Sequence, residues 1–262
     1  MFAGFSLEMA NFGDSLDTYY NSGKQICSNL GKTVQQSLKN YLDPNGVFDG
    51  DELEKDWFPQ LNADVFISHS HQDEKSVIAL AGWLNLNLGL SVFVDSCIWG
   101  CAADLLKQID KAYCVLEKKG EHVTYDYDKR NCSTSHIHMM LSVALTKMID
   151  RTECLIFYKS PNAIKVEKSI TQGQTFSPWI YHEIQTSRVI QRVPPKRLHT
   201  IMHFDEKRDM PPVAHNIEHD HLIPLTMVDL QSCYVLHREN FKRNVLNILY
   251  EMMNVPGNYA YE

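Results

Sequence analysis

Short apolar segments alternate with amphipathic segments from residue 63 onward, and this alternation predicts the fold. Residues 64–68, 91–94 and 154–158 are apolar runs bounded by polar residues, as expected for strands buried on both faces. Residues 198–204 and 221–225 predict a fourth and a fifth strand. Helical periodicity between these segments predicts crossover helices, which parallel strands require. We therefore expect an α/β protein with a flavodoxin-like, open, parallel five-stranded sheet and helices on both faces.

The segment before this alternating pattern predicts how the chain is divided into domains. Apolar residues recur at near-helical spacing between residues 16 and 41, so residues 1–62 predict an N-terminal helical extension and linker. The α/β domain then spans 63–262, with a polar insertion at about 117–135. A closing helix at about 238–252 is expected to turn Phe241 and Leu249 inward.

The composition excludes two classes of partner. The chain has 25 basic and 32 acidic residues, a net charge of −7 and no run of basic side chains, so charge-driven binding to nucleic acid or membrane is not expected. No apolar run approaches the roughly 20 residues that cross a bilayer, and no secretory signal is visible. Seven irregularly spaced cysteines fit a reducing compartment. We expect a cytoplasmic protein.

The predicted topology indicates where a ligand binds. In the common strand order 2-1-3-4-5, the crevice lies beyond the carboxyl ends of the first and third strands. The loops expected there are 68–73 and 158–177. The second loop leads into a helix that starts at Ser177 and Pro178, which are typical of N-cap and first helical positions.

A carboxylate and an aromatic ring are expected together at this crevice. Trp179 and Glu183 are four residues apart on the Ser-capped helix and therefore share one face. This pair suits a ligand with a ring and hydroxyl groups, such as a nucleoside. The expected substrate-binding residues come from two loops and the helix: Ser68, His69, Ser70, Asp95, Trp99 and Trp179.

Residues 63–253 resemble the Toll/interleukin-1 receptor (TIR) domain. Residues 64–70 look like its first sequence box, and residues 93–100 look like its second strand and BB loop. Trp179 and Glu183 are similar to the motif that carries the catalytic glutamate in NAD-cleaving members. With the N-terminal region, the chain resembles bacterial TIR proteins of antiphage defence, such as Thoeris systems. The resemblance implies cleavage of NAD+ at the nicotinamide–ribose bond, which releases nicotinamide and ADP-ribose or a cyclic or conjugated ADP-ribose signal.

The residues fit this chemistry. Nicotinamide leaves a cationic precursor as a neutral molecule, so the main requirement is to stabilise an oxocarbenium-like ribose. One carboxylate, Glu183, can supply that charge, with NAD+ as substrate and without a cofactor. The competing interpretation of Glu183 is an ordinary glutamate on a helix surface. The competing function is a non-catalytic TIR signalling or scaffold module that acts by homotypic assembly.

Other chemistries find little support in the sequence. Phosphate-binding and serine-hydrolase motifs do not occur. His215, His219 and His221 are close in sequence, but nearby prolines indicate a loop without fixed geometry, so no metal site is expected. Ile98 and Trp99 in the predicted BB loop indicate a contact surface. We therefore expect a homo-oligomer formed through TIR–TIR contacts, and a downstream effector protein that senses the product.

Overall fold

The computed structural model describes most of the chain as two compact units. The described residues are 1–30, 38–45, 48–98, 102–119, 122–164, 174–175, 177–195, 199–200, 220–255 and 259–260. The first unit comprises Met1–Gln25, Asn62–Val94 and Ile149–Glu262, and the second comprises Ile26–Leu61 and Asp95–Met148. The first unit therefore includes residues on both sides of the expected domain boundary at residue 62: one of its segments comes before this boundary, and the other two come after it.

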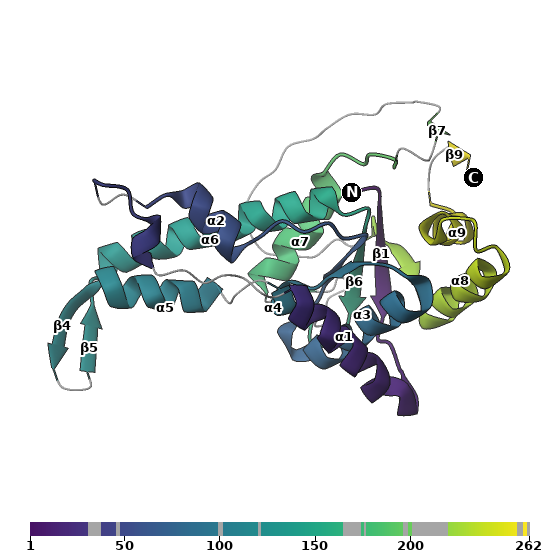
Figure 1. Cartoon of the computed structure of the whole chain (residues 1–262), viewed down its shortest axis with the longest axis horizontal. Coiled ribbons are helices and arrows are strands. Elements are labelled where there is room, and N and C mark those ends of the chain that lie inside the picture. The colour runs from purple at the N-terminus through teal and green to yellow at the C-terminus, as the bar shows by residue number, and fades with distance from the viewer. Residues whose placement is uncertain are drawn as a thin grey trace. The chain divides into compact units, whose positions relative to one another are not determined.

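A five-stranded parallel sheet forms the core of the first unit (Figure 1). Its strand order is β3-β2-β6-β1-β8, and every recorded pairing is parallel. All residues of β2 and the first five of β1 and of β6 are buried, as a sheet covered on both faces requires. The strands are β1 (Ala3–Glu8), β2 (Val65–Ser68), β3 (Val92–Phe93), β6 (Cys154–Lys159) and β8 (Ile223–Leu225).

Strand β1 corrects the expectation of a purely helical N-terminal extension. It pairs with β6 along its whole length and with β8 on its other side, so it occupies the fourth position of the sheet. Residues 198–204 were expected there. The structure instead has a two-residue strand, β7 (His199–Thr200), which pairs antiparallel with β9 (Tyr259–Ala260), and residues 201–204 lie outside the described part. The other four expected strands are confirmed.

The crossover connections place helices on opposite faces of this sheet. The β1–β2 and β2–β3 connections run toward the β3 edge and contain α1 (Leu16–Leu30) and α3 (Glu74–Leu88). The β6–β8 connection runs toward the other edge and contains α7 (Pro178–Val189). Because such crossovers are right-handed, α3 lies on one face of the sheet and α7 on the other. The expected α/β class with helices on both faces is confirmed at this level.

Two helices, rather than one, close the chain. Helix α8 (Met227–Glu239) begins with a capping box of Thr226 and Asp229, and α9 (Val245–Met252) begins at the N-cap Asn244. Leu249 is buried as expected, but Phe241 lies in the break between the helices and is 75% exposed. The expectation that Phe241 points inward is therefore wrong, because the single helix that would turn it inward does not form.

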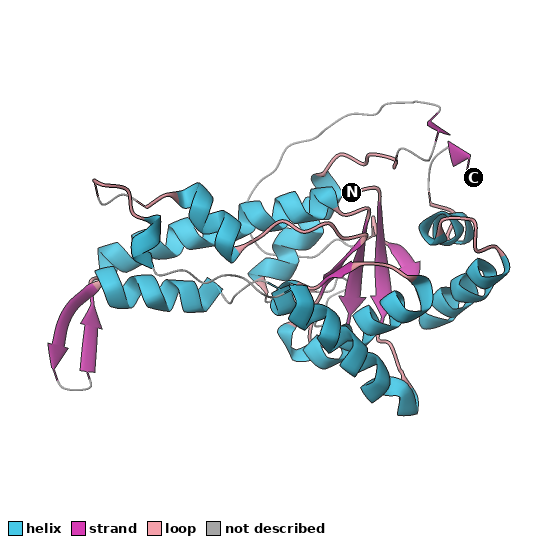
Figure 2. Ribbon diagram, in the orientation of Figure 1, coloured by secondary structure: helices cyan, strands magenta, loops and turns pink. Residues whose placement is uncertain are grey.

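Helices and an antiparallel hairpin form the described part of the second unit (Figure 2). The side chain of Asp110 accepts hydrogen bonds from Arg130 Nε (2.8 Å) and Ser133 Oγ (3.1 Å), which ties α5 to α6. The predicted insertion at 117–135 is thus most of an exposed hairpin followed by the first turns of α6, which begins at Tyr127. The elements are α2 (Gly50–Trp57), α5 (Ala102–Tyr113), β4 (Val115–Lys119), β5 (His122–Tyr125) and most of α6 (Tyr127–Arg151).

Short elements complete the description. Three 3-10 turns are η1 (Gly13–Ser15), η2 (Leu38–Tyr41) and η3 (His71–Asp73), and one short helix is α4 (Asp95–Ile98). None of the helices in the described part of the chain has the length and apolar character that a membrane crossing requires.

Two glycines let α1 and α3 approach each other closely. A Cβ atom added at Gly82 would lie 2.0 Å from the carbonyl oxygen of Tyr19, and one added at Gly23 would lie 1.9 Å from that of Ile78. Both distances are far shorter than a van der Waals contact, and both contacted atoms belong to the backbone. The helices can therefore keep this spacing only while both positions lack a side chain.

Alanine at Gly82 should destabilise the protein, although alanine usually stabilises a helix interior by about 1 kcal/mol relative to glycine. We expect Gly82→Ala to lower the free energy of unfolding by about 1–3 kcal/mol, because the two helices must move apart. Gly50→Ala is the matched control, since an added Cβ there meets nothing within 4 Å. Urea unfolding of both variants tests this, and equal effects would contradict the close approach.

Removal of β1 should prevent folding of the first unit. A protein that begins at Ala63, the expected start of the α/β domain, lacks the strand that joins β6 to β8. We expect it to be insoluble or to lack cooperative thermal unfolding, because the backbone groups of β6 and β8 that pair with β1 lose their partners. Circular dichroism during heating measures this, and a cooperative transition like that of the full chain would refute the expectation.

Candidate functional site

A buried hydrogen bond joins Glu183 to the end of β2, an inner strand of the sheet. Ser68 is the last residue of β2, and its hydroxyl donates to Glu183 Oε2 at 2.6 Å. Ser68 is 0% exposed and Glu183 is 2% exposed. Burial of a carboxylate costs free energy unless hydrogen bonds replace its lost contact with water. The bond from Ser68 therefore offsets part of the cost of burying Glu183.

The local sequence explains how Glu183 reaches this position. Ser177 caps α7, and its Oγ accepts a hydrogen bond from the backbone N–H of Ile180 (3.3 Å), as the Ser-Pro pair predicted. Pro178 has no N–H to leave unpaired in the first turn. Helix α7 therefore starts at a defined residue, and Glu183 falls in its second turn on the face that packs against β2.

This contact lies where the direction of the chain through the sheet reverses. From β2 the chain moves outward to β3, whereas from the adjacent strand β6 it moves toward β8. Ligands of open α/β sheets bind beyond the carboxyl ends of strands at such a switch point. Ser68 is at the carboxyl end of β2, so the Ser68–Glu183 pair is at the place where the topology predicts a site.

The loop after β2 carries the expected residues His69 and Ser70. His69 is 7% exposed, and its Nδ1 lies 3.3 Å from the carbonyl oxygen of Ile67. Ser70 is the N-cap of η3, and its hydroxyl accepts a hydrogen bond from the backbone N–H of Gln72. Both residues adjoin Ser68 in sequence, and the local backbone engages both side chains.

A second polar contact ties this loop to the loop after β6. The carboxylate of Asp73 accepts hydrogen bonds from Ser160 Oγ and from Asn162 Nδ2, the latter at 2.8 Å. Ser160 Oγ also accepts from the backbone N–H groups of Asn162 and Ala163, both at 3.1 Å. Asp73 is at the N-cap position of α3, but its side chain makes no cap hydrogen bond. Sequence reasoning missed this contact; the polar residues Ser160 and Asn162 just after an apolar strand were the available signal.

The loop after β1 is tied to the same edge of the sheet. The backbone N–H of Ala10 donates to the hydroxyl of Tyr158 at 3.2 Å. Burial raises the pKa of the Tyr158 hydroxyl above its ordinary value, so this group is neutral near pH 7. Tyr158 is 2% exposed near the end of β6. The loops after three neighbouring strands are thus held together by side chains at their carboxyl ends.

The remaining expected site residues are placed less closely or lie elsewhere. Trp179 is half-buried one turn before Glu183 on α7. Asp95 is the first residue of α4 and belongs to the second unit, and Trp99 lies outside the described residues. The structure therefore brings Ser68 and Glu183 into contact, and His69 and Ser70 follow Ser68 in the same loop, while the roles of all the expected site residues stay predictions.

His221 contacts Ser187 on α7. Ser187 Oγ donates to the carbonyl oxygen of Ile184 (2.8 Å) and lies 3.0 Å from His221 Nε2. The tautomer of His221 determines which of the two groups donates in the contact with Ser187. His215 and His219 lie outside the described residues, and within the described ranges no cluster of His, Cys, Asp or Glu could hold a metal ion.

Comparison of the chain with models of protein families, with curated proteins and with solved structures found no match.

The Ser68–Glu183 contact should have a large coupling energy. A hydrogen bond to a charged group contributes about 1.5–3 kcal/mol, and we expect a coupling of that size from the unfolding free energies of Ser68→Ala, Glu183→Gln and the double variant. The control is the exposed pair Thr226 and Asp229, whose side chains are also 2.6 Å apart. Water can replace that bond, so its coupling should be smaller. Equal couplings would mean that burial adds nothing at Glu183.

Proposed function

We propose that this protein is an NAD+-cleaving enzyme similar to TIR domains, and that Glu183 is its catalytic residue. The observation that carries the proposal is the hydrogen bond from Ser68 to the buried carboxylate of Glu183 at the switch point of a parallel sheet. The sequence resemblance names the substrate, and the topology independently favours this edge for a ligand.

The proposed reaction breaks the bond between C1′ of the ribose and the nicotinamide nitrogen. The bonding electron pair goes to that nitrogen, so nicotinamide leaves as a neutral molecule and needs no proton. Positive charge develops on the ribose, and a carboxylate close to C1′ and the ring oxygen stabilises it. Attack by water gives ADP-ribose, and attack by a group of the nucleotide or of another molecule gives a cyclic or conjugated product.

Ser68 has a positioning role in this proposal. Its hydroxyl holds one carboxylate oxygen of Glu183 at 2.6 Å and fixes the direction in which the other oxygen points. A carboxylate held in advance does not have to reorganise when charge develops, which is the main source of electrostatic catalysis. Trp179, one turn earlier on α7, is proposed to stack on a ring of the nucleotide.

The burial of Glu183 sets a requirement for this function. The side chain is 2% exposed, so the substrate must displace the groups that cover it before the carboxylate can act. A low-dielectric surrounding also strengthens the attraction between the carboxylate and the developing positive charge. Deep burial is therefore compatible with catalysis only if the cover opens for NAD+.

Glu183→Gln tests the proposal directly. We expect the wild-type protein to release nicotinamide from NAD+, and the variant to do so about 10²–10³ times more slowly, because a neutral amide does not stabilise the ribose cation. Glutamine keeps the size of the side chain. Chromatography of the reaction mixture measures nicotinamide, and mass spectrometry identifies the ADP-ribose product. Glu239→Gln, at the exposed end of α8, is the control and should keep wild-type activity.

The same experiment separates the proposal from its competitors. If Glu183 only ties α7 to β2, the Glu183→Gln protein loses stability but releases nicotinamide at the wild-type rate. If the protein is a non-catalytic module that acts by homotypic assembly, neither protein releases nicotinamide at any concentration, with or without self-association. If nicotinamide release is observed, the proposal extends to a homo-oligomer and to an effector protein that senses the product. Without nicotinamide release it does not.

A further inference from the structure

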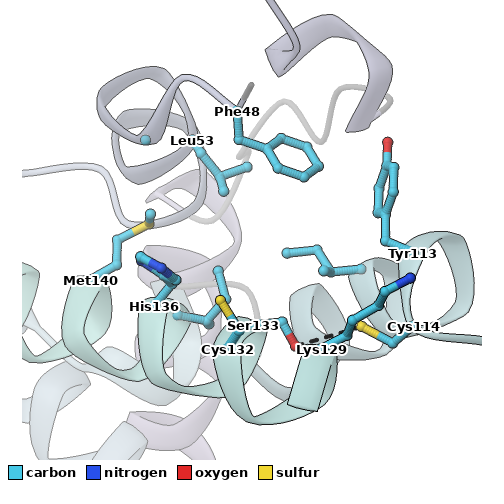
Figure 3. Close-up of a pocket in the computed structure, with 12 residues that line it drawn as sticks. Phe48, Leu53, Tyr113, Cys114, Lys129, Cys132, Ser133, His136 and Met140 are labelled. Atoms are coloured by element: carbon cyan, nitrogen blue, oxygen red, sulfur yellow. Dashed lines mark hydrogen bonds between the residues drawn. The ribbon is translucent and has the colours of Figure 1, made fainter. Parts of the chain in front are cut away.

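The second unit contains a cavity (Figure 3), and neither Ser68 nor Glu183 is among the residues that line it. Its volume is about 430 Å³, which is within the range of small-molecule sites. Three parts of the unit line it: Phe48 with α2, the C-terminal half of α5, and the N-terminal half of α6. All of its lining residues belong to the second unit, so the cavity is defined by that unit alone.

The inner part of the cavity is apolar. Leu53, Ile109 and Ile137 contribute aliphatic side chains that are between 2% and 7% exposed. Phe48 and Tyr113 form an aromatic wall, with ring centroids 5.3 Å apart and planes at 86°. Figure 3 shows Phe48 and Leu53 facing the side chains of α6 across the cavity. An apolar ring or short chain would be removed from water here without leaving a polar group unpaired.

Lys129 gives the rim of the cavity a positive charge. Lys129 and His136 lie on the face of α6 that lines the cavity, and both are exposed. The ammonium group of Lys129 has no ion-pair partner among the residues that the structure describes. The nearby buried acid, Asp110, is instead held by Arg130 and Ser133. A cationic group without a partner at the mouth of an apolar cavity favours a ligand with an acidic group.

We propose that this cavity binds a small amphiphilic molecule whose apolar ring or short chain enters between Phe48 and Ile137 and whose single acidic group meets Lys129. The proposal is independent of NAD+ cleavage, since none of these residues belongs to the Ser68–Glu183 site. His136 stands two turns further along the same face of α6. Cys132 lies between Lys129 and His136 on the same rim, so a bound ligand covers its thiol.

Two fluorescent probes with the same aromatic rings test both parts of this proposal. Anilinonaphthalene sulfonate carries an acidic group, and phenylnaphthylamine lacks it. We expect both to bind the full-length protein with an increase in fluorescence. Met140 is half-buried at the cavity wall, and Met140→Trp should narrow the cavity. We expect this variant to lower the affinity for both probes by roughly tenfold or more, because the rings can no longer be buried there. Ile137→Phe fills the floor and serves as a second variant if Met140→Trp does not fold.

The matched control is an apolar residue of the same unit that lies outside the cavity. Leu116 is 68% exposed on the β4–β5 hairpin and does not line the cavity. Leu116→Ser should leave the affinity for both probes unchanged. If Leu116→Ser lowers the affinity for the probes and neither Met140→Trp nor Ile137→Phe does so, the probes bind the hairpin and the cavity proposal is wrong. Absence of binding by either probe would refute it as well.

Lys129→Gln tests the acidic group. We expect it to weaken the sulfonate probe by about 2- to 5-fold, as loss of one exposed charge pair predicts, and to leave the neutral probe unchanged. Lys118→Gln on the hairpin is the charge-matched control. Equal effects on both probes would overturn the assignment of an acidic ligand.

Iodoacetamide labelling gives a separate readout of where the ligand binds. The sulfonate probe should slow labelling of Cys132 relative to labelling of Cys27, which does not line the cavity. An unchanged ratio of the two labelling rates would contradict the proposed position of the ligand.

Discussion

Parallel strands cannot be joined by a tight turn, and this constraint arranges the whole first unit. Each strand must be followed by a segment that carries the chain back to the end of the sheet where the strands begin. The carboxyl ends of all five strands therefore lie together at the opposite end. The loops after β1, β2 and β6 therefore meet there. Tyr158 holds the first of them, Asp73 holds the other two together, and Ser68 binds Glu183. These polar contacts gather at one edge because the topology brings the chain to it repeatedly.

Most of the sheet could be predicted from local patterns, but its fourth position could not. Strands β2, β3, β6 and β8 are apolar segments between helical ones, and their periodicity identifies them. Strand β1 contains Gly4, a residue type that is depleted in strands, and ends in the charged residue Glu8. Residues 198–204 have the stronger local pattern. Pairing with β6 over six residues decides the position, and that pairing joins segments about 150 residues apart, which no local pattern reports.

The candidate site was predicted where each residue stands at a recognisable boundary. Ser68 ends an apolar strand, and Glu183 follows a helix start marked by Ser177 and Pro178, so topology alone places the two residues at one edge. The pairing of Asp73 with Ser160 joins residues 87 apart, and Asp73 has an equally good local explanation as a helix cap. The cavity of the second unit is hidden from sequence for a similar reason, because its lining comes from three separate segments.

The burial of Glu183 links stability to any catalytic role that it has. A carboxylate that is 2% exposed contributes to folding only while a donor such as Ser68 compensates for its lost hydration. The same donor fixes the direction of the carboxylate that the proposed reaction needs. Ser68 is also the last residue of the inner strand β2, so its position is determined by the sheet and not by a loop. A site built on such an element holds its groups rigidly. The accompanying cost is that the substrate must open its own way to the carboxylate, so access to Glu183, rather than the arrangement of the pair, is the step at which regulation of this site would be most effective.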